Sequence, residues 1–256
     1  MRQWVLPFIV VCIFGVSLLL LGRFGKDQTP DPNEPTAAGQ MLPQVLSKNL
    51  KAASDVVNDR TRRGEITGEQ GQKMLMDYAD KLITSINLNQ ISEADAYLYA
   101  DIFRTAKRWD LARAAYMIAI KNSLNEDRRV NDHLRLALCE AMVGNYEQCI
   151  PTARRVFDAS LRDSAPILPA VLLEITPALR GHGFDVGLAK LLMDAAEIHS
   201  RTVVNRRRPE GITFIYARPH HLREAYRIAG ELFKAAGLTK EAQDAEVKRL
   251  SVTTIR

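Results

Sequence analysis

Apolar residues recur at intervals of three and four along most of this chain, the spacing of one face of an α-helix. The first such stretch is residues 44–60, and a second helix is expected to open at Thr67. Thr67 and Gln70 have the spacing of a capping box, in which each side chain accepts a backbone N–H of the other residue. Because each helix has one apolar face that needs a neighbour, the pattern predicts a helical hairpin within residues 44–90.

The pattern then repeats in pairs of short helices joined by tight turns. In the clearest pair, small Ala100 precedes aromatic Phe103 in the first helix, and small Ala112 precedes aromatic Tyr116 in the second. Small residues let two helices cross closely while the aromatic rings fill the space beside them. Related patterns follow in LRLALCEAMVGNYEQCIPTARRV (134–156), FDVGLAKLLMDAAEI (184–198) and AYRIAGELFKAAGLTKEAQDA (225–245).

Two of these units predict specific close contacts. We expect residues 93–120 to form an antiparallel helix pair with Ala100 near Ala112. Residues 223–250 are expected to do the same, with Gly230 near Ala242 at the closest crossing.

This alternation of small and aromatic residues resembles the tetratricopeptide repeat family over roughly residues 93–250. The third unit departs from the family, because Pro177 lies inside its expected first helix and Arg180 stands where an aromatic residue would be. The small anchors of the second helices are spaced by 37, 40 and 53 residues, against about 34 in the family. They are Ala112, Cys149, Ala189 and Ala242. The resemblance implies an irregular α-solenoid whose concave surface binds peptides or partner proteins.

The resemblance also implies which side chains would contact a partner. The family places ligand contacts at positions that correspond here to Tyr97, Asp101, Arg104, Thr105, Asn131 and Leu134. The set of lysine and asparagine residues with which family members hold a peptide carboxylate does not occur at these positions. The alternative interpretation is a solvated helix face with no partner.

A basic segment at residues 201–218 falls in the longest gap between anchors. Arg206, Arg207 and Arg208 lead into Pro-Glu-Gly, and the following ITFIYA is rich in β-branched and aromatic residues. We therefore expect an inserted loop here, with a short β-hairpin of TVVN against TFIY as its form. Residues 201–223 hold six arginines and one glutamate, so an acidic partner or an anionic lipid surface is the candidate ligand. The alternative is a solvated loop that caps the neighbouring repeat.

The N-terminal segment has a different composition. Residues 4–22 (WVLPFIVVCIFGVSLLLLG) carry no charge and, as a helix, are long enough to span a bilayer. No A-x-A-like cleavage pattern follows, so an uncleaved transmembrane anchor is favoured over a signal peptide. Residues 27–43 contain four prolines and predict a flexible linker. These features predict a single-pass membrane protein with an extracytoplasmic repeat domain, the cytoplasmic-facing orientation being the alternative.

Composition narrows the possible chemistry. Without Arg2, Arg23 and Lys26 the chain has 32 basic residues against 30 acidic ones, so a nucleic-acid partner is not expected. The cysteines form no CxxC motif, and Cys139 is expected to face away from Cys149, with no disulfide between them. No sequence motif of a catalytic, metal or nucleotide site occurs, and we expect no cofactor.

The sequence therefore predicts an all-α protein with a single N-terminal transmembrane helix, followed by a solenoid domain at residues 91–256. Its expected function is a membrane-anchored scaffold or adaptor for protein–protein interactions in the cell envelope, not catalysis. The alternative is a helical enzyme or an accessory subunit with an unrecognised site. Titratable residues with strongly shifted pKa values gathered in one deep pocket would favour the alternative.

Overall fold

The computed structural model describes residues 43–87, 91–123, 125–159 and 167–253. Every regular element within these ranges is helical, so the all-α prediction is confirmed for the part of the chain that is described. The helices are α2 (Pro43–Arg62), α3 (Gly68–Ile83), η2 (Glu93–Asp95), α4 (Ala96–Thr105), α5 (Trp109–Asn122), α6 (Glu126–Met142), α7 (Tyr146–Arg154), α8 (Ile167–Ala170), η3 (Val171–Ile175), α9 (Thr176–Leu179), α10 (Asp185–Arg201), α11 (Pro209–Ala235) and α12 (Thr239–Ser251).

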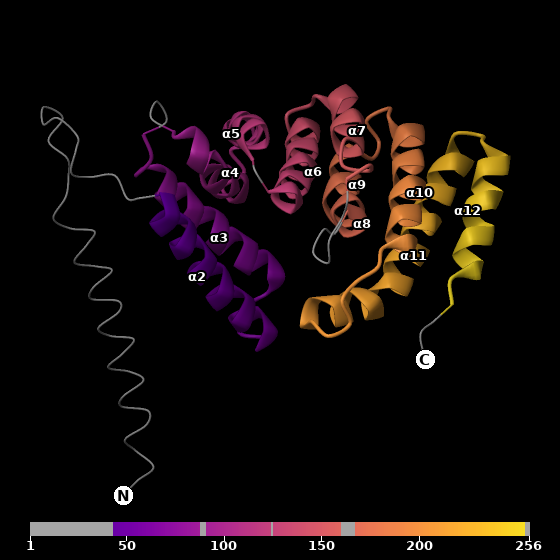
Figure 1. Ribbon diagram of the computed structural model, residues 1–256, viewed down its shortest axis with the longest axis horizontal. Coiled ribbons are helices and arrows are strands. Elements are labelled where there is room, and N and C mark those ends of the chain that lie inside the picture. Colours follow the sequence, from indigo (N-terminus) through magenta and orange to yellow (C-terminus); the bar gives the residue numbers. More distant parts are fainter. Residues whose placement is uncertain (1–42, 88–90, 124, 160–166, 254–256) are drawn as a thin grey trace, which may run out of the picture.

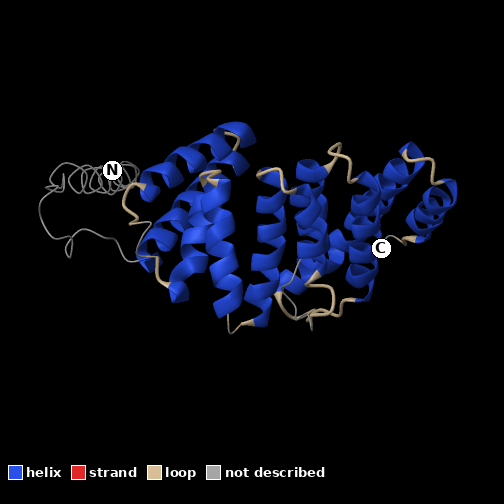
Figure 2. Cartoon of the chain, turned by 90° about the horizontal axis from the view of Figure 1, so that it is seen from above, coloured by secondary structure: helices blue, strands red, loops and turns tan. Residues whose placement is uncertain are grey.

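These helices form five consecutive hairpins in the described ranges. The pairs are α2 with α3, α4 with α5, α6 with α7, the run α8–η3–α9 with α10, and α11 with α12. Figure 1 shows the hairpins side by side in a curved row, and Figure 2 shows the same row from above. In Figure 1, α2 and α3 at one end and the first part of α11 near the other extend to the same side of the row.

Helix α3 begins as its capping box predicts. The Thr67 hydroxyl accepts the N–H of Gln70 at 3.2 Å, and the Gln70 side chain accepts the N–H of Thr67 at 2.8 Å. Two amides at the helix start, which have no partner within the helix, are satisfied in this way.

Three of the hairpin turns are built alike. Lys107, Gly144 and Gly237 each follow a first helix and have φ values of 57°, 84° and 74°. In each turn the next residue donates its amide to a carbonyl five residues back, at 2.8 to 2.9 Å. This bond closes a Schellman motif, which needs the left-handed backbone that glycine adopts without steric cost. Lys107 adopts the same left-handed backbone conformation although, unlike glycine, it carries a side chain.

The two helix pairs predicted from small residues are present, with α4 packed against α5 and α11 packed against α12. Ala100 and Ala112 are both fully buried in the core shared by α4 and α5. A side chain added at Gly230 would lie 3.7 Å from the Ala242 carbonyl oxygen and 3.6 Å from the Ala245 methyl group. Both helix pairs predicted from the spacing of small residues are therefore confirmed.

The fourth hairpin accommodates Pro177 by a change of helix type. Proline has no N–H and its ring collides with the carbonyl four residues earlier in an α-helix. Here η3 is a π-helical turn, in which the N–H of Thr176 bonds to the Val171 carbonyl five residues back. The Thr176 hydroxyl donates to the same oxygen at 2.8 Å. The wider turn lets the first helix of this hairpin continue to Leu179.

The β-hairpin predicted within residues 201–218 is wrong. Residues 202–208 form a short connection, and α11 begins at Pro209 and runs for 27 residues. Pro209 is at the start of the helix, where proline is favoured. Gly211 permits a close approach, because a side chain there would lie 2.1 Å from the Asn205 carbonyl oxygen. The glycine therefore allows the preceding loop to pack on the first turn of α11, and it does not form a β-turn.

The core is divided into two clusters. The N-terminal cluster contains most of the buried apolar residues from Leu46 to Tyr116, together with Leu136 and Cys139. The C-terminal cluster contains the other buried apolar residues from Val130 to Phe233. Trp109 is partly buried and packs against both clusters.

The two described cysteines belong to different clusters. Cys139 is buried in the N-terminal cluster and Cys149 in the C-terminal cluster, and both thiols are free. The prediction that they are not bonded to each other is confirmed. Burial raises the pKa of each thiol to about 12, which makes both poor nucleophiles at neutral pH.

The predicted localisation as a single-pass membrane protein is contradicted. Among the described residues no helix is both long enough and apolar enough to cross a membrane. The longest, α11, carries charged residues along its length and packs against α10 and α12. Residues 4–22 and 27–42, on which the predicted anchor and most of the linker fall, lie outside the described residues. The domain boundaries at 44–90 and 91–256 stay predictions.

Candidate partner-binding face

A group of polar side chains links the first helices of the second and third hairpins. It comprises Tyr97, Asp101 and Arg104 of α4, Tyr116 of α5, and Arg128, Asp132 and Arg135 of α6. We call this group the inner-face network.

Asp101 is the centre of the network. Its Oδ1 accepts the Tyr116 hydroxyl at 2.7 Å and Nη1 of Arg135 at 2.6 Å. Its Oδ2 accepts Nη2 of Arg128 at 3.3 Å. Arg104 donates from Nε to the Tyr116 hydroxyl oxygen at 3.2 Å. One carboxylate thus joins three helices from two hairpins.

Arg128 is held from three sides. Its Nε donates to Oδ2 of Asp132 at 3.0 Å, one helical turn further along α6. Its guanidinium lies 4.4 Å from the centre of the Tyr97 ring and donates to the Tyr97 carbonyl at 3.2 Å. A cation over an aromatic face adds electrostatic attraction to these bonds. The orientations of Arg128 and Tyr97 are therefore fixed by each other.

Burial controls the protonation of two members. Burial raises the pKa of Asp132 to about 6, although the positive charge of Arg128 acts in the opposite direction. Burial, followed by the charge of Asp101, raises the pKa of Tyr116 well above its ordinary value, so its hydroxyl stays a hydrogen-bond donor. The three arginines face Asp101 and Asp132 within the network. The net charge of the inner-face network becomes more positive when Asp132 takes up a proton.

The residues predicted from the family resemblance separate into three groups. Tyr97, Asp101 and Arg104 are brought together as partly exposed members of the network. Thr105 and Asn131 are also partly exposed, but their side chains bond to carbonyls of their own helices, at 2.8 and 3.1 Å. Leu134 is only 3% exposed and packs in the C-terminal cluster, so its place in the candidate set is corrected.

Three of the seven network members were not predicted from the sequence. Arg128, Asp132 and Arg135 were not selected, although their spacing of four and three places them on one helical face. Tyr116 was selected only as a space-filling aromatic. Its hydroxyl role depends on Asp101, which lies in the preceding helix and whose orientation periodicity does not give.

The basic residues Arg206, Arg207 and Arg208 are exposed and lie outside the network. They precede α11, where the Asn205 side chain accepts the N–H of Arg207 at 2.9 Å. None of their three side chains makes an ion pair with a described residue. Positive charges at the amino end of a helix are unfavourable, because the helix dipole is positive there too.

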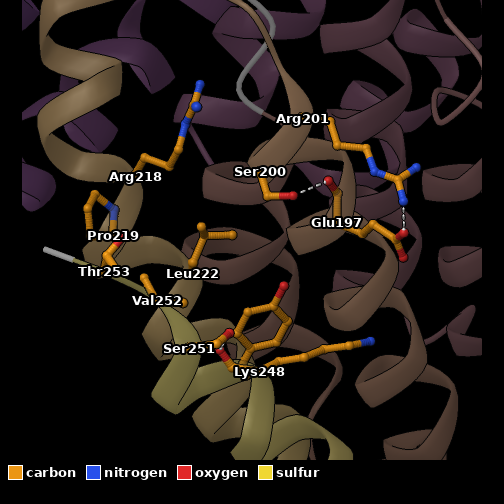
Figure 3. Close-up of a pocket in the computed structure, with 11 residues that line it drawn as sticks. Glu197, Ser200, Arg201, Arg218, Pro219, Leu222, Lys248, Ser251, Val252 and Thr253 are labelled. Atoms are coloured by element: carbon orange, nitrogen blue, oxygen red, sulfur yellow. Dashed lines mark hydrogen bonds and ion pairs between the residues drawn. The ribbon is translucent and has the colours of Figure 1, made fainter. Parts of the chain in front are cut away.

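A second feature is a cavity of about 440 Å³ between α10, α11 and α12, shown in Figure 3. Arg201 and Glu197 stand on one side of it, and Arg218 stands on the other. Glu197, Ser200, Arg201, Arg218, Pro219, Leu222, Tyr226, Lys248, Ser251, Val252 and Thr253 line the cavity.

The most strongly shifted groups do not meet in this cavity. Asp132 belongs to the network, while Cys139 and Cys149 are in the two core clusters. His199 is buried beside Phe214 and His221, and burial lowers its pKa to about 3. None of these groups lines the cavity. Within the described ranges, no cluster of three or more potential metal-binding side chains is present.

Comparisons with known proteins add little to this description. No family model matches the chain, and no curated protein matches it. It is similar to a solved structure of nearly identical TPR-like repeats from a Podosopora anserina protein described as a kinesin light chain. The identity is 15%, covering 80% of this chain and 98% of the other, with a TM-score of 0.38. A variant of that structure gives the same identity and score, with 80% and 97% covered. Likeness at this level carries no argument about this chain.

Proposed function

We propose that this protein is an interaction scaffold whose inner-face network binds an extended polar segment of a partner protein. The observation that carries the proposal is the rigid arrangement of charged and aromatic side chains on the first helices of successive hairpins. Asp101 and Arg128 hold Tyr97, Arg104 and Arg135 in position before any partner arrives. Side chains that are already ordered lose little conformational entropy on binding.

The exposure of the network supports this role. The side chains of Asp101, Arg104, Arg128 and Arg135 are 25 to 29% exposed, so each is packed on one side and open on the other. Arginine and tyrosine are enriched among the residues that dominate binding energy at protein interfaces. A partner segment would meet donors and an aromatic ring without having to unfold the helices.

Site-specific crosslinking tests the proposal. A photoreactive phenylalanine analogue placed at Tyr97 should crosslink a partner in extract from the native cells. The same analogue at Met117, which is 52% exposed on the second helix of the hairpin, is the matched control. Crosslinking of the same proteins from both positions would contradict the proposal.

A charge substitution then tests the site with the captured partner. Arg135→Ala should weaken binding of the purified partner about tenfold, corresponding to about 1.4 kcal/mol. Arg129→Ala, on the same helix at an exposed position outside the network, should leave the affinity unchanged. If Arg135→Ala binds as the parent does, while both variants keep the parental melting temperature, the network is not the binding site.

A further inference from the structure

The cavity between α10, α11 and α12 is lined by both apolar and polar side chains. Pro219, Leu222, Tyr226 and Val252 supply its apolar lining. Ser200, Ser251 and Thr253 also line the cavity and are exposed to solvent.

Two features of α11 lie beside the cavity lining. Pro219 lies inside α11 and cannot donate a backbone hydrogen bond to the preceding turn. Arg223, one turn further on, donates from Nη2 to the Val252 carbonyl at 2.9 Å, which fixes the end of α12 against α11. The cavity therefore lies beside a point where α11 and the end of α12 are joined by a hydrogen bond.

Most charges around the cavity are already neutralised. Arg201 is paired with Glu197. Lys248 lies 3.1 Å from the carboxylate of Asp244. Because each of these two cations already has a carboxylate partner, neither gives a reason to expect an anionic ligand.

Arg218 is different. Its Nη2 donates to the Thr202 carbonyl at 2.5 Å, and its guanidinium lies 4.9 Å from the centre of the Phe214 ring. Its Nε is buried without a hydrogen-bond partner. No described carboxylate pairs with it, and burial together with the positive charge of Arg206 lowers its pKa. An arginine in this position is stabilised by an added carboxylate near its guanidinium, which supplies the negative charge that no described residue provides.

The positive charge continues beyond the cavity. Arg206 is close enough to Arg218 to affect it, and Arg207 and Arg208 follow directly in the chain. Val203, in the same connection, is 86% exposed. A small apolar cavity beside a longer basic surface matches a chain with several carboxylates better than a single small anion.

We propose that this cavity binds a short acidic segment of a partner protein. One apolar side chain of the segment lies over Pro219, Leu222 and Tyr226, a neighbouring carboxylate pairs with Arg218, and further carboxylates face Arg206–Arg208. This is a second site, and it does not depend on the inner-face network.

Labelled short peptides provide the probe. One set has Leu, Phe or Trp at the centre and aspartate at all other positions, and the matched set has lysine in place of aspartate. A third set keeps the aspartates and has serine at the centre. With the whole protein, fluorescence polarisation should show at least about tenfold tighter binding for the acidic apolar set than for the other two. The difference from the lysine set should shrink as salt is added.

Two variants locate the binding. Arg218→Gln removes the charge but keeps a donor for the Thr202 carbonyl, and it should weaken acidic peptides about tenfold. Lys240→Gln, at an exposed position on α12 outside the cavity, is its control and should change nothing. Ser251→Trp fills the cavity from an exposed position and should abolish the preference for an apolar centre. Gln243→Trp is the matched control for the added ring.

The proposal is wrong if the acidic apolar peptides bind no better than their lysine or serine counterparts. It is also wrong if folded Ser251→Trp protein, verified by circular dichroism, binds them as the parent does. The Ser251→Trp result decides the question even if Arg218→Gln weakens binding only because that variant is less stable.

Discussion

Replacing Asp132 with asparagine should remove a pH-dependent loss of stability from the inner-face network. The Asp132 side chain is fully buried, and Arg128 is its charged partner at 2.9 Å. Asparagine has the same shape and still offers Arg128 an amide oxygen, so the packing of α6 is kept. The substitution therefore removes the ionisable group of Asp132 while keeping the shape of its side chain.

The size of the effect follows from the pKa of Asp132, which burial raises from 3.8 to about 6 against the opposing charge of Arg128. The folded chain therefore holds this proton more tightly than the unfolded chain does. Its contribution to stability is complete below pH 3.8 and is lost as the pH rises through about 6. At about 1.4 kcal/mol for each pKa unit, the parent loses about 3 kcal/mol over this range.

Urea denaturation of parent and variant at a series of pH values measures this loss. The free energy of unfolding of Asp132→Asn, relative to the parent, should rise by about 2.5 kcal/mol between about pH 4 and about pH 7. Asp55→Asn, on the exposed side of α2, controls for the loss of a carboxylate elsewhere. A difference between parent and Asp132→Asn that stays constant with pH would refute the reasoning, whatever its sign.

Four further predictions concern the hairpins and their cores. Lys107→Gly relieves a left-handed backbone at an exposed turn and should raise the free energy of unfolding by about 1 kcal/mol, measured by urea titration. Ala112→Leu overpacks a fully buried crossing and should cost about 1 to 3 kcal/mol, seen as a lower melting temperature. Cys139 and Cys149 should resist alkylation in the folded protein and react in denaturant, with mass spectrometry as the readout. Because burial lowers the pKa of His199, the unfolded chain takes up a proton that the folded chain does not. The parent should therefore lose about 2 kcal/mol more than His199→Leu between pH 7 and pH 5.

Periodicity was sufficient to predict the helix pairs within residues 44–90, 93–120 and 223–250, because the two helices of each pair bury their apolar faces against each other. It also predicted Ala100 and Ala112 at a crossing and Thr67 as a helix cap. These features depend on residues close together in sequence, where side-chain direction follows directly from helix geometry.

The segment after α10 was predicted wrongly because local composition was given too much weight. ITFIYA is rich in residues that favour strands, but β propensity reflects packing against neighbouring strands more than an intrinsic backbone preference. Here Phe214 packs against His199 of α10, and the whole segment continues a helix. Gly211 was interpreted as a turn residue when its role is to admit the Asn205 carbonyl.

The candidate site was predicted only in part for a different reason. Tyr97, Asp101 and Arg104 were selected from the family resemblance and share one helix, whereas their partners Arg128 and Arg135 lie in the next hairpin. Which arginine reaches Asp101 depends on the angle and offset between α4 and α6. Neither quantity is contained in the spacing of residues within one helix.

The division of the core into two clusters has a consequence for how the chain comes apart. In repeat proteins each unit is stabilised mainly by its immediate neighbours, so a weak junction lets one end open while the other stays folded. Among the described residues Trp109 packs against both clusters, and the bonds from Asp101 to Arg128 and Arg135 join α4 to α6. A partner lying along both helices would tie the two folding units together. Binding of the partner would then make unfolding more cooperative, so that two separate unfolding transitions merge into one.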